Sequence, residues 1–215
     1  MKNLIAINGS PRRNWNTAEL LKHAMQGAED AGASTELVNL YSLKYKGCTS
    51  CFACKLKSRP HGTCAMSDDL SPVLERVKDA DALIIGSPIY FMNLSAGTLA
   101  FIERLFFSNY IYSDEIPTVF PKKLPSAFVY TMNMTQGQFE QFGMKERLGM
   151  YELFTRRILG VTPKILRAYD TVQFKDYSRY ESSIFDAEHK LAYREEHFAE
   201  DCAAAYEIGR ALVAE

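Results

Sequence analysis

The sequence predicts an α/β fold in which a parallel sheet is covered by helices on both faces. Short apolar segments alternate with longer helical patterns from end to end, and the segment 82–86 is apolar throughout. A strand buried on both faces of such a sheet carries a continuous apolar run instead of an alternating one. Because 215 residues suit one large α/β domain, we expect a single domain over 1–215 with right-handed crossovers.

Each element has a local signal of its own. The first strand is short and rich in β-branched residues, and the helix after it has Asn16 or Thr17 as a suitable N-cap and Gly32 as a suitable C-cap. The expected strands cover residues 2–8, 35–40, 82–86, 126–131 and 164–169. The expected helices cover about 16–31, 68–78, 95–106, 138–159 with a break near Gly143 or Gly149, and 186–214. Three segments lack a period: a cysteine loop at 47–64, a loop at 87–93 and an aromatic insertion at about 106–123.

Charge and hydropathy exclude several classes of partner. The formal net charge is −1, so we expect neither nucleic acid nor an anionic membrane surface as the main partner. No apolar run approaches the ~20 residues that a membrane span needs. The chain begins with a strand pattern instead of a charged and then apolar leader, from which we expect a cytoplasmic protein.

The loop at 9–17 joins the first strand to the first helix and is rich in groups that bind phosphate. It contains the hydroxyls of Ser10 and Thr17 and the guanidinium groups of Arg12 and Arg13. A helix N-terminus at this point adds free N–H groups and the positive end of the helix dipole. Ligands of parallel sheets lie at the carboxyl ends of the strands, which is where this loop begins. The segment therefore predicts a site for a phosphate ester.

The residues of the candidate loops and their spacing exclude several known phosphate-binding motifs. The dinucleotide fingerprint requires three glycines, whereas only Gly9 is present and Pro11 stands close behind it. A Walker loop requires Gly-Lys-Ser/Thr, which is missing here. A cysteine phosphatase loop places Arg six positions after Cys, but Cys54 and Arg59 are five apart. The ligand class that remains is a mononucleotide whose single phosphate fits this hydroxyl-rich loop.

The loop at 87–93 suggests what the rest of that ligand is. Pro88 stiffens the backbone, and the rings of Tyr90 and Phe91 offer a flat face. Exposed backbone groups of this loop could bond the edge of a heterocycle. Together with the phosphate loop this indicates a flat ring system, although each ring taken alone could equally pack on the adjoining helix.

Three groups of residues occur in a recognisable order. They are Gly9-Ser10-Pro11-Arg12 through Asn16-Thr17, Cys48-x-x-Cys51-x-x-Cys54 followed by Cys64 and Asp68-Asp69-Leu70, and Gly86-Ser87-Pro88-Ile89-Tyr90-Phe91-x-Asn93-x-Ser95-Ala96. Together they resemble the NAD(P)H-dependent FMN reductase and iron–sulfur flavoprotein group of the flavodoxin-like proteins. The resemblance covers 1 to about 135 well and the remainder by element order. It implies a three-layer flavodoxin-like sandwich with strand order 2-1-3-4-5, non-covalently bound FMN, and commonly a homodimer with the flavin near the interface.

The resemblance also assigns roles to residues. The FMN phosphate would be held by Ser10, Arg12, Asn16 and Thr17, with Arg13 as the alternative to Arg12. The isoalloxazine ring would be lined by Pro88, Ile89, Tyr90, Phe91 and Asn93, and completed by Thr131, Asn133 and Gly137. No catalytic residue is expected, because the cofactor carries the chemistry. The implied activity passes electrons from NAD(P)H through FMN to a small-molecule acceptor. The competing hypotheses are an electron-transfer protein that is reduced by a ferredoxin and a flavin-free binding protein.

Four clustered cysteines raise the question of a metal centre. Thiolates at Cys48, Cys51, Cys54 and Cys64 could surround a [4Fe–4S] cluster, and tetrahedral zinc would accept the same ligands. In iron–sulfur flavoproteins the spacer before the last cysteine is tighter than the nine residues found here. We therefore favour a structural or thiol-redox loop over a cluster. A cluster, if present, would favour the hypothesis of an electron-transfer protein that is reduced by a ferredoxin.

Overall fold

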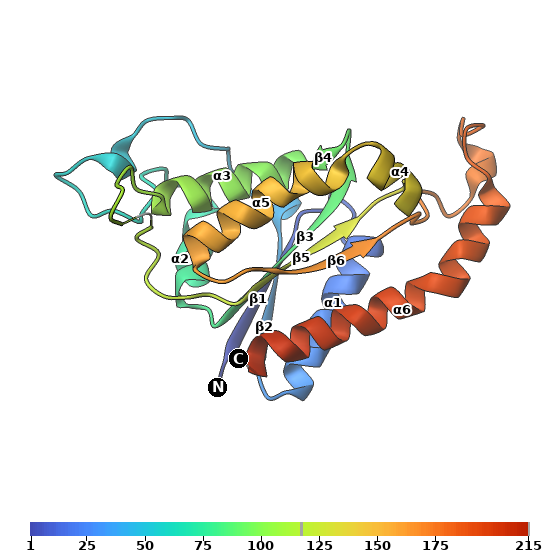
Figure 1. The fold of residues 1–215 in the computed structure, drawn as a ribbon, viewed down its shortest axis with the longest axis horizontal. Coiled ribbons are helices and arrows are strands. Elements are labelled where there is room, and N and C mark those ends of the chain that lie inside the picture. The colour runs from blue at the N-terminus through green and yellow to red at the C-terminus, as the bar shows by residue number, and fades with distance from the viewer. Residues whose placement is uncertain (117, 215) are drawn as a thin grey trace.

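The computed structural model describes residues 1–116 and 118–214, which form a central sheet with helices on both faces (Figure 1). The strands are β1 (Asn3–Asn8), β2 (Ser34–Asn39), β3 (Ala82–Tyr90), β4 (Asn93–Leu94), β5 (Ser126–Thr131) and β6 (Lys164–Ala168). The helices are α1 (Asn16–Asp30), α2 (Ser71–Asp79), α3 (Ala96–Asn109), α4 (Gln136–Gln141), α5 (Met144–Leu159) and α6 (Ala187–Ala214). Among the described residues, no helix is both long enough and apolar enough to cross a membrane.

The strand order is β2-β1-β3-β5-β6, and these five strands are parallel. The predicted flavodoxin-like order is therefore confirmed. The additional strand β4 pairs antiparallel with the end of β3 and lies off the main path. In the register of the sheet, Asn8 pairs with both Asn39 and Gly86, so the carboxyl ends of neighbouring strands lie at one edge.

Each central strand sends side chains to both faces, which explains the continuous apolar runs. Ile5 and Ile85 lie in the core beneath α2, α3 and α5, whereas their neighbours Leu4 and Ile84 lie in the core beneath α1 and α6. Alternation along a strand places successive side chains on opposite faces. Helices α1 and α6 pack closely, since a Cβ on Gly209 would come within 1.7 Å of a backbone oxygen of α1. The apolar cores on the two faces of the sheet thus fix the strand ends that carry the loops.

Several predicted boundaries are wrong, and each has a local cause. The loop expected at 87–93 is largely strand, because Ser87 and Pro88 continue the pairing with β5. The chain then reverses at Phe91 and Met92, whose φ values of 46° and 63° are those of a two-residue hairpin. Trp15 occupies the N-cap position of helix α1 without a side-chain capping hydrogen bond, so Asn16 and Thr17 lie in the first turn of the helix.

The remaining differences concern helix ends. The expected break in the helix at 138–159 occurs at Gly143, which has a φ of 61°. Helix α4 begins earlier than expected because Thr135 and Gln138 form a capping box. Helix α3 extends to Asn109, so the aromatic insertion begins later than predicted. Pro117 of this insertion lies outside the described residues.

Candidate functional site

Loops from the carboxyl ends of β1, β3, β5 and β6 line one cavity of about 360 Å³. A volume of this size is in the range of ligand pockets. Nine of the residues that the sequence assigns to FMN lie in its wall: Ser10, Arg12, Asn16, Thr17, Pro88, Ile89, Tyr90, Thr131 and Asn133. Tertiary structure thus brings together loops that are far apart in the sequence.

One end of the cavity lies at the start of α1. Helix geometry leaves the N–H groups of the first turn without intrahelical partners, and here they accompany the buried side chains of Asn16 and Thr17. The Oγ of Ser10 accepts a hydrogen bond of 3.1 Å from the backbone N–H of Arg12, which orders the loop. At Gly9 a Cβ would lie 1.8 Å from the hydroxyl of Thr98, so only glycine fits at this turn.

Arg12 is held in place by the loop that follows β6. Its Nη1 donates to the backbone oxygen of Gln173 at 2.6 Å, and its guanidinium lies 4.6 Å from the ring centre of Trp15. The side-chain nitrogens of Trp15 and Asn16 both donate to the backbone oxygen of Val172. This loop therefore fastens the guanidinium at the cavity wall. Arg13 is exposed and lies outside that wall.

The other end of the cavity is lined by the ends of β3 and β5. The hydroxyls of Thr17 and Thr131 contact each other at 2.7 Å and connect the two ends. The buried Oδ1 of Asn133 has no hydrogen-bond partner among the described residues. Tyr90 is half-buried, and burial raises the pKa of its hydroxyl, which stays protonated near neutral pH. An acceptor and a donor are thus available to a flat polar ring.

Three of the residues assigned to the ring lie away from this cavity. The side chain of Phe91 projects from the β3–β4 hairpin and is fully exposed. The Oδ1 of Asn93 accepts a hydrogen bond of 2.8 Å from the hydroxyl of Tyr151 on α5. Gly137 lies in the first turn of α4.

The donors and acceptors fit FMN. A phosphate monoester would meet helix N–H groups, hydroxyls and a guanidinium at one end, which is the chemistry of an anion site. A flavin carries an imide N–H, which could donate a hydrogen bond to the buried oxygen of Asn133. Residues 2–149 match the family described as NADPH-dependent FMN reductase. The chain belongs to the NADPH-dependent FMN reductase family.

A curated relative of this member of the NADPH-dependent FMN reductase family is similar to it over about half of the chain. An iron–sulfur flavoprotein of Methanocaldococcus jannaschii is 35% identical over 101 residues, which is 47% of this chain and 50% of that protein. The chain therefore spans about half the length of the curated relatives that it matches.

Two solved structures share the fold over almost the whole chain. An NAD(P)H:quinone oxidoreductase from Methanothermobacter marburgensis has a TM-score of 0.70 at 18% identity, covering 99% of this chain and 97% of that chain. An FMN-dependent NADH-azoreductase from Bacillus anthracis, solved with FMN, has a TM-score of 0.64 at 12% identity and covers 97% of this chain and 100% of that chain.

In this member of the NADPH-dependent FMN reductase family the cysteine loop lies at the far end of α3 from β4 (Figure 1). Arg104 of α3, which is fully buried, closes the base of the loop. It donates to the backbone oxygens of Lys46 and Met66 and forms an ion pair of 2.6 Å with Asp68. The two ends of the loop are thereby tied to one side chain.

The four cysteines of the loop do not fit a metal centre in this arrangement. Cys48, Cys51, Cys54 and Cys64 line a common cavity of about 10 Å³, which has room for about one water molecule. In the part of the chain that the structure describes, no three His, Cys, Asp or Glu side chains are grouped so as to hold a metal ion. Burial raises the pKa of the Cys54 thiol, and the ammonium of the adjacent Lys55 donates to backbone oxygens of Phe107 and Tyr110.

Sequence reasoning missed the loop after β6 as part of the site. Val172, Gln173 and Phe174 line the cavity of this family member, and Thr171 is buried beside them. The available signal was topological: the loop follows a parallel strand, so it begins at the same edge of the sheet as the phosphate loop. The pattern of these residues has no motif that would have indicated the contact with Trp15.

Proposed function

We propose that the protein binds FMN non-covalently in the cavity between the loops after β1, β3, β5 and β6, and passes electrons from NADPH or NADH to a small-molecule acceptor. The observation that carries this proposal is the single cavity in which the phosphate-type loop of α1 meets the ends of β3 and β5. Membership of the family supports the same conclusion.

The phosphate of FMN would be bound by the start of α1. Ser10, Asn16 and Thr17 supply short polar side chains, and Arg12 supplies a fixed positive charge. Charge-assisted hydrogen bonds of this kind are roughly twice as strong as neutral ones. Four protein groups and the helix dipole thus converge on one anion.

The ring of FMN would lie toward Ile89, Tyr90 and Asn133. The unsatisfied oxygen of Asn133 would accept from the ring, and the hydroxyl of Tyr90 would be a donor at its edge. When bound, FMN supplies the capacity to accept hydride and to release electrons one or two at a time, so no acid, base or nucleophile of the protein is required. The protein would orient the ring and determine the electrostatic environment around it.

The names of similar proteins support a reductase. The structural neighbours include an NAD(P)H:quinone oxidoreductase and an FMN-dependent NADH-azoreductase. The curated relatives are iron–sulfur flavoproteins, but the thiol arrangement in this chain does not favour a cluster. We therefore place the reductase first and the ferredoxin-dependent carrier second.

The decisive experiment follows flavin bleaching. FMN-loaded protein is mixed with NADPH or NADH without oxygen, and absorbance in the flavin band is recorded with time. Rapid bleaching with either nucleotide supports the reductase. Absent bleaching with both, together with about four irons and four sulfides per chain, would favour the carrier. Failure of the purified protein to take up added FMN would overturn both hypotheses.

Further proposals concern the assembly and location of the protein. We infer that residues 1–215 form one domain. We also infer a homodimer, because Met150, Leu153 and Phe154 expose apolar surface on α5. Size-exclusion chromatography with light scattering tests the dimer. The five free cysteines suit a reducing compartment, so we place the protein in the cytoplasm.

A further inference from the structure

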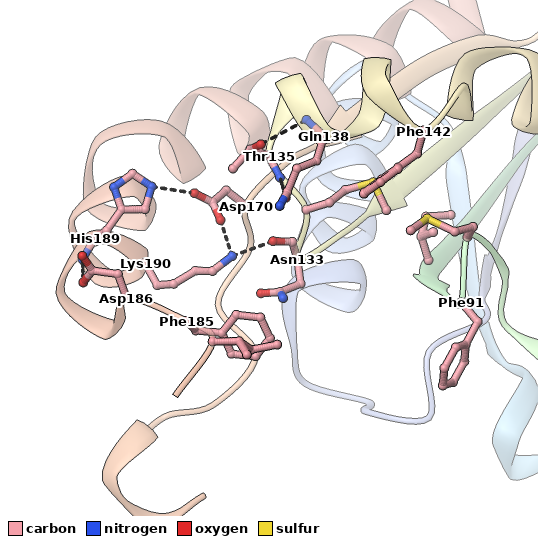
Figure 2. A pocket seen from close by; sticks show the side chains of 14 residues that line it. Phe91, Asn133, Thr135, Gln138, Phe142, Asp170, Phe185, Asp186, His189 and Lys190 are labelled. Carbon is pink, nitrogen blue, oxygen red and sulfur yellow. Dashed lines mark hydrogen bonds and ion pairs between the residues drawn. The ribbon is translucent and has the colours of Figure 1, made fainter. Parts of the chain in front are cut away.

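A second cavity of about 500 Å³ adjoins the cavity proposed for FMN. The two share Ile89 and Asn133 in their walls. Figure 2 shows the second cavity between α4, the β3–β4 hairpin and the beginning of α6. Its position at the ring end of the FMN site makes it the natural place for a molecule that reacts with the ring.

The polar wall of this cavity is a buried network whose charges compensate each other. The Nζ of Lys190 donates to the backbone oxygen of Asn133 at 2.6 Å and to the carboxylate of Asp170 (Figure 2). The Nε2 of His189 lies 2.8 Å from the other carboxylate oxygen of Asp170. The side chains of Asp170 and Lys190 are 2% and 6% exposed. The cation of Lys190 is therefore already paired, and the network holds the loop after β5.

The backbone of Asp170 is fixed by the loop after β5. Its φ of 49° lies in the left-handed region, which Asp adopts more readily than most residues with a side chain. Here the backbone N–H of Asp170 donates to Met134 and the N–H of Thr171 donates to Met132, which locks the turn against the loop after β5.

The rest of the wall is apolar and open to solvent, and part of it adjoins the network, since the Nζ of Lys190 lies 5.7 Å from the ring centre of Phe185. It includes Met92, Met134, Phe142, Ile184 and Phe185. Phe142 is 46% exposed and Ile184 is 86% exposed. Apolar side chains around a concave site gain free energy when a ligand covers them, and methionines adapt to flat ligands of different shape.

The charges of the cavity disfavour an anion. Asp170 and Lys190 cancel, Asp186 adds one negative charge, and His189 adds at most one positive charge. The formal total is therefore between −1 and 0. A diphosphate or sulfonate would find no uncompensated cation here, whereas a neutral ring system would lose little hydration.

We propose that this cavity binds the electron-accepting substrate, and that this substrate is a neutral, flat compound of two or three fused rings with polar oxygens at its edge. The polar oxygens face His189, and the rings cover Phe142 and Ile184. The proposal rests on the proposed function, because it takes the neighbouring cavity as the FMN site.

The test measures binding to the oxidised, FMN-loaded protein by calorimetry, without nicotinamide nucleotide. The probes are 2-(hydroxymethyl)anthraquinone, which is neutral, and anthraquinone-2-sulfonate, which carries one negative charge. We expect the neutral probe to bind at least about tenfold more tightly, the factor that corresponds to about 1.4 kcal/mol. Equal affinities, or no binding of the neutral probe, would overturn the proposal.

Two matched pairs of variants locate the probe. Ile184→Ala should weaken binding of both probes severalfold, whereas Ile116→Ala, an exposed change in the insertion, should not. Asp186→Asn should raise affinity for the sulfonate about fivefold and leave the neutral probe unchanged, because one repulsive charge is removed. Asp114→Asn is its control on the exposed insertion. Identical behaviour of each variant and its control would contradict the assignment.

FMN content separates the failure of this proposal from the failure of the proposed function. If the neutral probe binds FMN-free protein but is displaced by FMN, the flavin itself fills this cavity, so the inference fails while FMN binding stands. If the protein takes up no FMN by absorbance, the proposed function fails.

Discussion

The hydroxyl oxygens of Thr17 and Thr131 lie 2.7 Å apart, although 114 positions separate them in the chain. Both residues are buried. One belongs to the first turn of α1 and the other ends β5, so the contact joins the phosphate loop to the strand that leads into the ring end of the cavity. The two halves of the proposed FMN site are therefore one connected unit.

Thr17→Val keeps the shape of the side chain and removes its hydroxyl. We expect the dissociation constant for FMN to rise by about tenfold or more, since a hydrogen bond to a charged group contributes about 1.5–3 kcal/mol. Quenching of FMN fluorescence on binding measures it. Thr35→Val on β2, which makes its contact with Glu29 outside the cavity, is the control. An unchanged dissociation constant in the Thr17 variant would remove the first turn of α1 from the site.

Arg12→Gln should reduce the preference for FMN over riboflavin, which lacks the phosphate. The guanidinium is fixed by Gln173 and Trp15, so its charge acts on the phosphate end of the cavity. We expect affinity for FMN to fall by about tenfold or more and affinity for riboflavin to stay the same. Arg13→Gln is the matched control on an exposed neighbour. A larger effect in the Arg13 variant would reverse the assignment of the two arginines.

Asp68→Asn should destabilise the fold by about 3 kcal/mol, because it leaves the buried guanidinium of Arg104 without its carboxylate. Burial alone would raise the pKa of Asp68, but the hydrogen bond and charge of Arg104 outweigh this and lower it. The contribution is therefore present above the unfolded-state pKa and lost as the pH falls through the folded-state pKa. Urea denaturation at pH 7 and in acid, with exposed Asp79→Asn as the control, measures the difference. Equal loss of stability at both pH values would contradict the ion-pair account.

Asp201→Asn should change stability with the opposite dependence on pH from Asp68→Asn. Burial on α6 raises the pKa of Asp201 to about 6, so the native state binds a proton more tightly than the unfolded chain. This favours the fold in acid, and the benefit is lost as the pH rises through about 4 to 6. At pH 8 the variant should be more stable than the parent by about 1 kcal/mol, a value reduced for solvent screening of a half-buried group. Thermal unfolding at pH 4 and pH 8 tests this. Glu196→Gln on the same helix should show no such dependence on pH.

The sequence predicted the parts of the site that depend on a local pattern. The loop at 9–17 could be recognised from one glycine, two hydroxyls and two arginines, and its place at the edge of the sheet follows from parallel topology. Phe91 illustrates where such reasoning stops. Its ring was expected at the flavin because it is aromatic and near Pro88, but strand pairing extends to Tyr90 and the hairpin turns Phe91 into solvent.

What the sequence determined by itself is the succession of strands and helices along the chain and the residues that follow each strand, because apolar runs, caps and turns act over a few neighbouring positions. The order of the strands within the sheet was implied by the resemblance to flavodoxin-like proteins. Only the tertiary structure decided which of these residues meet. Arg12 lines the cavity and Arg13 lies outside it because a loop more than 150 residues away holds the guanidinium, and the network of Asp170, His189 and Lys190 forms because α6 returns across the end of β6. Contacts of this range depend on how whole elements pack, and no local periodicity encodes them.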